Sequence, residues 1–256
     1  MPHIPEKTGE LHAIPLAMGE IKPGDSIPEK IVEALRRRRL PLVAGDILVL
    51  KHKIVSKAEG QIVSLKKVKP SRAAQRWARA YDLDARVSEL ALSQARRIVR
   101  QRNGVLITQT RHGWICANSG VDVSNVDGGA SAVLLPKDAD RSAAHIHRAL
   151  KKKFGVHVPI IISDSFGRPW REGLTEVAIG LGGMPAFRDY RGQFDPFGYA
   201  LRVSLEAVAD ELACVAGLVC GKLTGVPACI IRGFQYSRAR GRAKDLIRPA
   251  SRDLFR

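Results

Sequence analysis

The sequence predicts an α+β fold in which mixed sheets carry flanking helices. Short apolar runs typical of strands are interspersed with longer amphipathic segments typical of helices. A length of 256 residues, with 45% hydrophobic and 26% charged residues, fits an ordinary globular enzyme. We expect a single domain over residues 1–236, with room for two lobes, followed by a basic C-terminal tail over residues 237–256.

The first half of the chain predicts strands and helices in mixed order. Pro28 suits the first turn of a helix, and Gly60 ends a turn that carries Lys57. The apolar runs 104–108 and 114–117 look like paired strands that lead into a polar loop. The expected elements are a strand at 11–16, a helix at 28–38, a strand at 46–51, helices at 71–80 and 85–101, the two paired strands, and the loop 118–125.

The second half continues the mixture. A basic amphipathic segment predicts a helix at 140–154, and a β-branched apolar run predicts a buried strand at 156–163 that ends at Asp164. Beyond residue 236 the chain is polar and basic, so we expect either an extended arm or a docked helix there. The remaining expected elements are short strands at 176–179 and 185–187, a helix at 205–218 and a strand at 226–232.

Hydropathy and cysteine usage argue against a membrane-spanning protein and against a cysteine-based zinc or CxxC site. No apolar stretch approaches the roughly 20 residues that span a bilayer, and residues 1–7 lack an apolar signal core. The four cysteines match no zinc or CxxC spacing and lie in apolar segments, which favours buried reduced thiols. We therefore expect a cytoplasmic protein without a membrane partner.

The net charge of +17 makes a polyanion a candidate partner. The basic residues are scattered along the chain, however, and only 5% of residues are aromatic, which leaves few platforms for stacking bases. Solvated helix faces and attraction for small anionic substrates explain the charge better than nucleic-acid binding does.

Two acids stand where apolar runs give way to loops. Asp122 lies in the loop 118–125, and Asp164 is followed directly by Ser165. Carboxylates and hydroxyls at such positions suit Mg²⁺ or Mn²⁺ that bridges phosphates, so these three residues are the predicted metal ligands. The alternative is purely structural: Asp164 and Ser165 cap the next segment, and Asp122 closes an Asx-turn.

Lys57 is a candidate phosphate contact, although a lone lysine in a turn is more often simply solvated. The chain has neither a Walker A sequence nor a GxGxxG followed by a ribose-binding acid, which argues against the common nucleotide sites. For a general base, Glu206, Asp210 and Glu211 are candidates on the expected late helix. Ordinary helix solvation or salt bridging explains them better, and the catalytic residues stay unknown.

Several motifs occur in one order along the chain. They are KIVSKAEG at 53–60, NSGVDVSNV at 118–126, ISDSFGR at 162–168, VADE at 208–211, GKLT at 221–224 and RGF at 232–234. In combination they resemble the coenzyme F420-0:L-glutamate ligase family (F420-0 gamma-glutamyl ligases), from about residue 11 to residue 234. The ordered set is far more specific than any one of its members.

The resemblance implies a GTP-dependent ligase that adds L-glutamate to coenzyme F420-0 and releases GDP and phosphate. It also implies Mg²⁺ or Mn²⁺, stimulation by K⁺, and that family's α+β fold in an intertwined homodimer. The family's metal ligands fall on Asp122, Asp164 and Ser165, where the hydroxyl residue is usually Thr. The nucleotide-binding positions fall on Met18, Gly19, Glu20, Ile21, His52, Lys57, Asn125 and Gly221.

Two departures affect the site. Archaeal members carry an acid near the position of Lys222, where the resemblance implies a ligand for a second metal, and a basic loop stands there in this chain. The family has small hydroxyl residues where His52 and Lys53 stand here, which changes a nucleotide contact. Three rival functions stay open: a metal-dependent phosphohydrolase, a basic nucleic-acid-binding protein, and a related ligase with a different acyl substrate.

Overall fold

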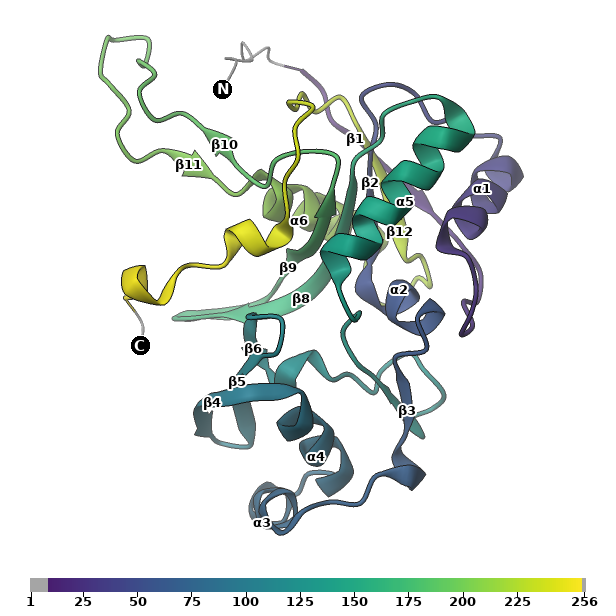
Figure 1. The fold of residues 1–256 in the computed structure, drawn as a ribbon, viewed down its shortest axis with the longest axis vertical. Coiled ribbons are helices and arrows are strands. Elements are labelled where there is room, and N and C mark those ends of the chain that lie inside the picture. Colours follow the sequence, from purple (N-terminus) through teal and green to yellow (C-terminus); the bar gives the residue numbers. More distant parts are fainter. Residues whose placement is uncertain (1–8, 255–256) are drawn as a thin grey trace.

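The computed structural model describes residues 9–254 and has a five-stranded mixed sheet at its centre (Figure 1). Residues 1–7, for which no signal core was expected, and the last two residues of the predicted tail lie outside the described residues. The strand order is β1-β12-β2-β8-β9, and only the β2–β8 pair is parallel. These strands are β1 (His12–Leu16), β12 (Ala228–Arg232), β2 (Ile47–Lys51), β8 (Ile160–Arg168) and β9 (Arg171–Gly182).

The central sheet is buried on both faces because its strands are apolar on both sides. Along β2, Leu48 and Leu50 face a core shared with α1 (Ile27–Arg38) and α5 (Ala139–Phe154). The alternate residues Ile47 and Val49 face the opposite core, which includes α6 (Val208–Cys220). Strands covered on both faces read as continuous apolar runs, which is why ILVL and III were recognisable in the sequence.

A smaller lobe is built from the chain between β2 and α5. It contains a three-stranded antiparallel sheet, and its core around Leu90, Leu106 and Val121 is separate from the two cores of the central sheet. The pair β3–β7 and the helix α2 (His52–Ala58) connect this lobe to the main body (Figure 1). Its elements are β3 (Ile62–Ser64), η1 (Leu65–Lys67), α3 (Arg72–Tyr81), α4 (Ala85–Gln94), β4 (Ala95–Arg102), β5 (Val105–Thr110), β6 (Ile115–Ala117), η2 (Asn118–Gly120) and β7 (Ser131–Val133).

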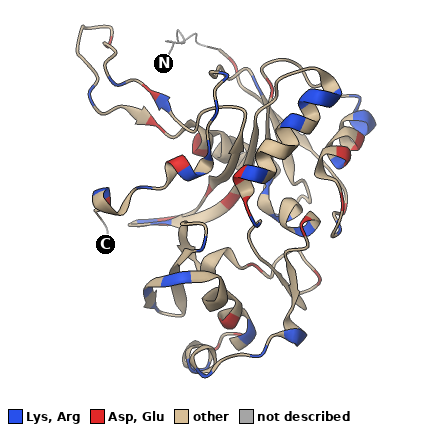
Figure 2. Ribbon diagram, viewed as in Figure 1, with Lys and Arg blue, Asp and Glu red and all other residues tan. Residues whose placement is uncertain are grey.

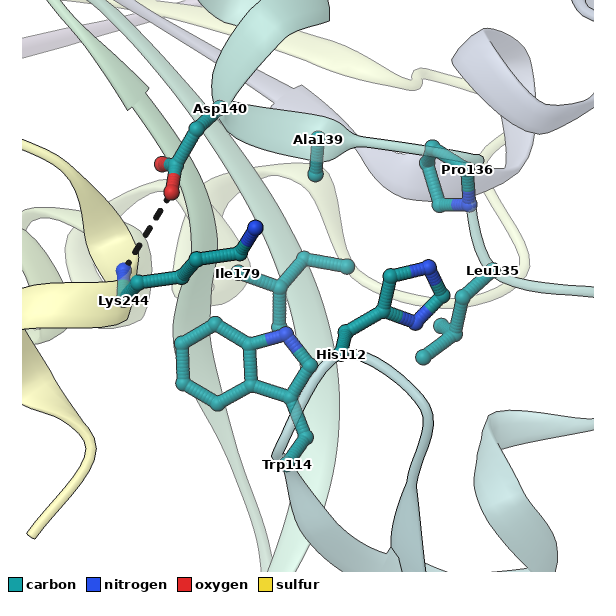
Figure 3. A pocket seen from close by; sticks show the side chains of 8 residues that line it. All are labelled: His112, Trp114, Leu135, Pro136, Ala139, Asp140, Ile179 and Lys244. Atoms are coloured by element: carbon teal, nitrogen blue, oxygen red, sulfur yellow. Dashed lines mark hydrogen bonds between the residues drawn. The ribbon is translucent and has the colours of Figure 1, made fainter. Parts of the chain in front are cut away.

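Two further segments extend from the body. The strands β10 (Arg188–Asp189) and β11 (Leu205–Glu206) form the base of an arm that projects away from the sheet (Figure 1). The tail docks through two short 3₁₀ turns, η3 (Ala243–Leu246) and η4 (Ala250–Arg252). The buried Asp140 carboxylate accepts hydrogen bonds from the backbone N–H of Ala243 at 2.7 Å and of Lys244 at 3.3 Å, so the tail is held at the start of α5 (Figure 3).

Several local expectations were wrong. Residues 95–101 are not helical: α4 ends at Gln94, and β4 follows because it pairs with β5. Strand β8 does not end at Asp164 but continues to Arg168 in pairing with β9. Lys57 lies in α2 and not in a turn. Glu206 belongs to β11, since α6 begins only at Val208, and 185–187 is not a strand in this structure. The short strand expected at 176–179 is part of the much longer β9, which pairs with β8 along its length. The remaining expected elements are present within a few residues of their predicted ends.

Close contact between β9 and α5 leads to a stability prediction. A Cβ atom added at Gly180 would lie 2.5 Å from the backbone oxygen of Ala139, so Gly180→Ala is expected to destabilise the protein by about 2–3 kcal/mol. Gly167→Ala is the matched control, because its added Cβ would lie 3.9 Å from Leu174, an ordinary contact. Urea unfolding of both variants measures the difference, and equal midpoints would contradict the packing described.

Candidate active site

The site lies where the parallel strands β2 and β8 reach the same edge of the sheet. The register places Lys51 opposite Ser163, so the segment that follows β2 lies beside Asp164 and Ser165. A cavity of about 420 Å³ opens at this edge and continues between α2 and the loop after α6. Ends of neighbouring strands in mixed sheets are common places for small-molecule sites.

The cavity brings together all but one of the predicted site residues. Met18 is the exception: it is 1% exposed and packs in the core. The predicted residues that line the cavity are Gly19, Glu20, Ile21, His52, Lys57, Asp122, Asn125, Asp164, Ser165 and Gly221. Segments separated by about two hundred residues in sequence therefore share one concave surface. If these residues only capped local turns, they would not need to lie together.

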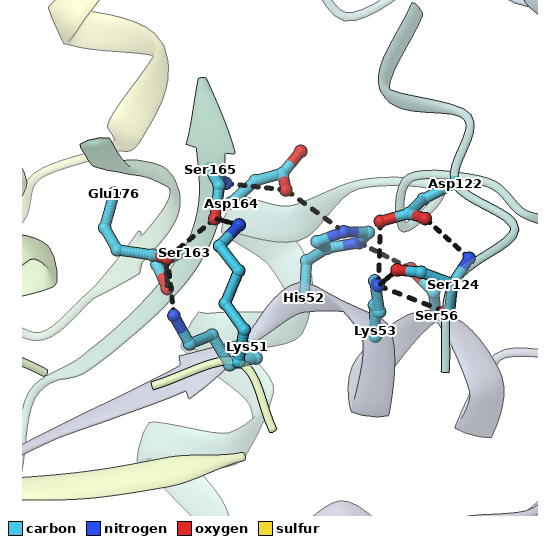
Figure 4. A network of polar contacts seen from close by, with 11 residues as sticks. Lys51, His52, Lys53, Ser56, Asp122, Ser124, Ser163, Asp164, Ser165 and Glu176 are labelled. Atoms are coloured by element: carbon cyan, nitrogen blue, oxygen red, sulfur yellow. Dashed lines mark hydrogen bonds and ion pairs between the residues drawn. The ribbon is translucent and has the colours of Figure 1, made fainter. Parts of the chain in front are cut away.

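Asp122 is paired with Lys53, which the sequence marked only as a departure from the family pattern. Its carboxylate lies 2.7 Å from Lys53 Nζ and accepts a hydrogen bond from the Ser124 backbone N–H at 2.7 Å (Figure 4). Burial by itself would raise the pKa of Asp122, but the hydrogen bonds from Lys53 and Ser124 outweigh burial and hold that pKa below its ordinary value. Asp122 does close an Asx-turn with Ser124, so the structural alternative holds locally alongside its position in the cavity.

The Asp122 contacts predict the effect of removing the Lys53 ammonium. Lys53→Met is expected to raise the pKa of the Asp122 carboxyl, since burial persists while the charged donor is lost. Lys57→Met is the control, because the Lys57 ammonium donates to the carbonyl oxygen of Asn125 at 2.9 Å and not to Asp122. Carboxyl chemical shifts followed against pH by NMR test this, and the same Asp122 titration in both variants would refute it.

Asp164 lies beside a buried histidine. His52 Nε2 is 3.3 Å from Asp164 Oδ1, and His52 Nδ1 is 3.3 Å from Ser56 Oγ. The Nε2 atom is fully buried, and it is not aligned for a hydrogen bond with the carboxylate. Asp164 Oδ1 also accepts the backbone N–H of Ser165 at 2.7 Å. His52 thus lines the cavity as predicted, and it lies next to the carboxylate of Asp164.

Glu176 on β9 completes the site, although the sequence reading missed it. It accepts hydrogen bonds from Ser163 Oγ at 2.9 Å and from Ser165 Oγ at 2.7 Å, and it lies 2.5 Å from Lys51 Nζ (Figure 4). The antiparallel register places Ser165 directly opposite Glu176. The sequence held no sufficient signal for Glu176, because its position opposite Ser165 depends on the register of two strands together.

The three candidate bases take different positions. Asp210 accepts the backbone N–H of Ala178 at 2.8 Å, and burial raises its pKa. Glu206 and Glu211 are exposed, and among the described residues none of these three acids lines the cavity. The structure therefore gives no support to a base on α6.

The donor atoms in the cavity fit a hard divalent cation. Across residues 9–254, no three His, Cys, Asp or Glu side chains are grouped as a metal centre. Mg²⁺ does not need such a cage, since it is usually held by one or two carboxylates together with substrate phosphates. Asp122, Asp164 and Ser165 offer oxygen atoms only, and the cationic neighbours of this group are Lys53 at Asp122 and Lys222, whose Nζ lies 3.2 Å from Ser165 Oγ.

Lysines and acids face one another across the cavity. Four lysines line it, Lys51, Lys53, Lys57 and Lys222, together with four acids, Glu20, Asp122, Asp164 and Glu176. Elsewhere Lys and Arg are distributed over α1, α5, the smaller lobe and the tail, and they do not gather on a single element (Figure 2). The lining is therefore balanced in formal charge, and its ammonium groups can donate hydrogen bonds to the oxygen atoms of small anions.

Fold and site together describe an α+β protein with an oxygen-rich, lysine-lined cavity at one edge of its central sheet. The chain matches the F420-0:Gamma-glutamyl ligase family over residues 15–233 and belongs to that family. It is similar to proteins named coenzyme F420:L-glutamate ligase: 44% identical to that of Methanothermobacter thermautotrophicus, over 91% of this chain and 93% of the relative. Identity to the Methanopyrus kandleri protein is 41%, over 97% and 98% of the two chains. These matches confirm the family resemblance and place the chain among ligases.

Proposed function

We propose that this protein is a GTP-dependent ligase that joins L-glutamate to coenzyme F420-0 through an amide bond and releases GDP and phosphate. One observation carries the proposal: in a chain of this ligase family, segments far apart in sequence place Asp122, Asp164 and Ser165 in the same cavity as four lysines. Nucleoside triphosphate, a phosphodiester and a carboxylate are all anions, and such a cavity is suited to hold them together.

The metal and nucleotide ends of the cavity are assigned as follows. Asp122, Asp164 and Ser165 would hold Mg²⁺ or Mn²⁺, which neutralises phosphate charge when bound. Lys57, Asn125 and the 19–21 and 221–224 segments, which all line the cavity, would contact GTP. K⁺ is proposed on the family resemblance alone, without assigned ligands.

Joining a carboxylate to an amine in water is uphill, so the proposed reaction first activates the carboxylate. The terminal carboxylate of F420-0 attacks the γ-phosphorus of GTP, so that a C–O–P bond forms while the β–γ bond breaks and GDP leaves. The glutamate amine then attacks the acyl carbon, loses a proton and expels phosphate. Lys51, Lys53 and Lys222 lie where they would offset the charge that accumulates during phosphoryl transfer.

The assembly and location are part of the same proposal. We propose a homodimer in the cytoplasm, with F420-0, L-glutamate and GTP as the small-molecule substrates and with no nucleic-acid partner. Among the described residues, no helix combines the length and apolar character needed to cross a bilayer.

Phosphate release separates the ligase from a phosphohydrolase that would use the same acids. With GTP, F420-0 and Mg²⁺ present, the ligase is expected to release phosphate in step with product only after L-glutamate is added. A related ligase with a different acyl substrate would stay inactive until its own substrate replaced F420-0. Rapid phosphate release without glutamate would overturn the proposal in favour of hydrolysis.

A further inference from the structure

Glu176 is a buried acid at the edge of the candidate site that neither the sequence motifs nor the proposed reaction uses. Its side chain is only 8% exposed, and it lies on β9 directly opposite Ser165 of β8. Both carboxylate oxygens are engaged: one accepts from Ser165 Oγ and lies beside Lys51 Nζ, and the other accepts from Ser163 Oγ. Burying a charge in this way is costly unless it is paired, and Lys51 provides that pair.

The direction of the Ser165 hydrogen bond matters for what the hydroxyl can do. A hydroxyl has one proton to donate and two lone pairs that accept. Because Ser165 donates its proton to Glu176 at 2.7 Å, its lone pairs remain for acceptor contacts in the cavity. One such contact is present already, since Lys222 Nζ donates to Ser165 Oγ at 3.2 Å. Ser165 is therefore oriented as an oxygen acceptor for a cation.

The helix behind Glu176 leaves room for this arrangement. A Cβ atom added at Gly217 of α6 would collide with the Glu176 side chain. The thiol of Cys214 donates to the Glu176 carbonyl oxygen at 3.2 Å, so α6 also fixes the backbone that carries the acid. The carboxylate is thus held by the two serines of β8 and by Lys51, while α6 holds the backbone that carries it.

We propose that Glu176 is a positioning residue that orients the Ser165 oxygen toward a divalent cation in the cavity. This rests on the proposed function, in which Ser165 is a metal ligand. Glu176 acts through Ser165 and does not need to touch the cation itself. Partners that orient metal ligands in this way typically change metal affinity about 10–100-fold when they are replaced.

A double-mutant cycle on Mn²⁺ binding tests the proposal without measuring turnover. The loss of the free Mn²⁺ electron paramagnetic resonance signal gives the dissociation constant for the wild type, Glu176→Gln, Ser165→Ala and the double variant. Glu176→Gln is expected to raise this constant about 10–100-fold in the wild type. In the Ser165→Ala background the same change is expected to have an effect at least about fivefold smaller, since residues that act as a unit are not additive.

The controls separate positioning from general charge loss and from misfolding. Glu172→Gln makes the same change at an exposed position of the same strand and is expected to leave Mn²⁺ binding unchanged. If thermal melting shows that Glu176→Gln does not fold, Glu176→Asp replaces it in the cycle, because it keeps the charge beside Lys51 while shortening the reach to Ser165.

Each outcome bears on a different claim. Equal effects of the Glu176 substitution in both backgrounds, or no effect in a folded variant, would overturn the positioning role while leaving the proposed ligase intact. A wild-type protein that binds no Mn²⁺ would instead contradict the metal site of the proposed function, on which the inference rests.

Discussion

Replacing Asp164 by asparagine is expected to lower kcat/KM for glutamate addition about a thousandfold, the loss typical when a preorganised charge at a reacting centre is removed. Asp164 lies between His52 and Ser165 and lines the cavity, so the change removes one negative charge where the cation is proposed to bind. The amide oxygen of asparagine still accepts the Ser165 backbone N–H, so the fold is expected to persist. Steady-state kinetics and a thermal melt measure the two effects.

Asp82→Asn is the matched control for Asp164→Asn. Asp82 is exposed, ends α3 in the left-handed conformation at φ 51°, and lies outside the cavity lining. Asparagine tolerates that conformation, so activity and melting temperature are expected to match the wild type. If Asp164→Asn kept most of its activity, the assignment of Asp164 to the reacting centre would be wrong.

Arg232→Met is expected to destabilise the protein by about 3–4 kcal/mol, because it leaves the carboxylate of Asp46 buried without its charged partner. Asp46 is 0% exposed, and the guanidinium of Arg232 donates to its two oxygens at 2.7 and 2.9 Å. The pair joins the end of β12 to the start of β2. At about 2–4 °C per kcal/mol for a chain of this size, the melting temperature should fall by about 6–16 °C.

Arg242→Met tests whether this loss is specific to burial. Arg242 also pairs with an aspartate, Asp245, but its side chain is 69% exposed. Exposed pairs contribute about 0–1 kcal/mol, so this variant should melt within a few degrees of the wild type. Comparable losses in the two variants would show that burial of Asp46 does not set the stability of the pair.

Helices and strands that depend on the local sequence were predictable, whereas those that depend on strand pairing were not. The runs ILVL and III predicted buried strands because both of their faces are covered. Residues 95–102 carry helix-compatible arginines, and only their pairing with β5 makes them a strand. Asp164 looked like a strand end because polarity rises there, but the register with β9 extends β8 by four more residues.

The same distinction applies to the residues of the candidate site. The ordered motifs identified Asp122, Asp164, Ser165, Lys57 and Asn125, and the structure brings these residues to one cavity. Lys51 entered through the parallel β2–β8 register, Lys53 through the contact of α2 with the loop that carries Asp122, and Glu176 through the antiparallel β8–β9 register. Register is a property of two distant segments together, so reading either one by itself could not reveal these partners.

Mass spectrometry of F420-0 incubated with the full-length protein, GTP, Mg²⁺ and L-glutamate tests the central claim most directly. The account predicts a mass increase of glutamyl units that requires every component and is lost in Asp164→Asn. An F420-0 that stays unmodified, with folded protein that binds GTP and Mg²⁺, would contradict the proposed acyl substrate.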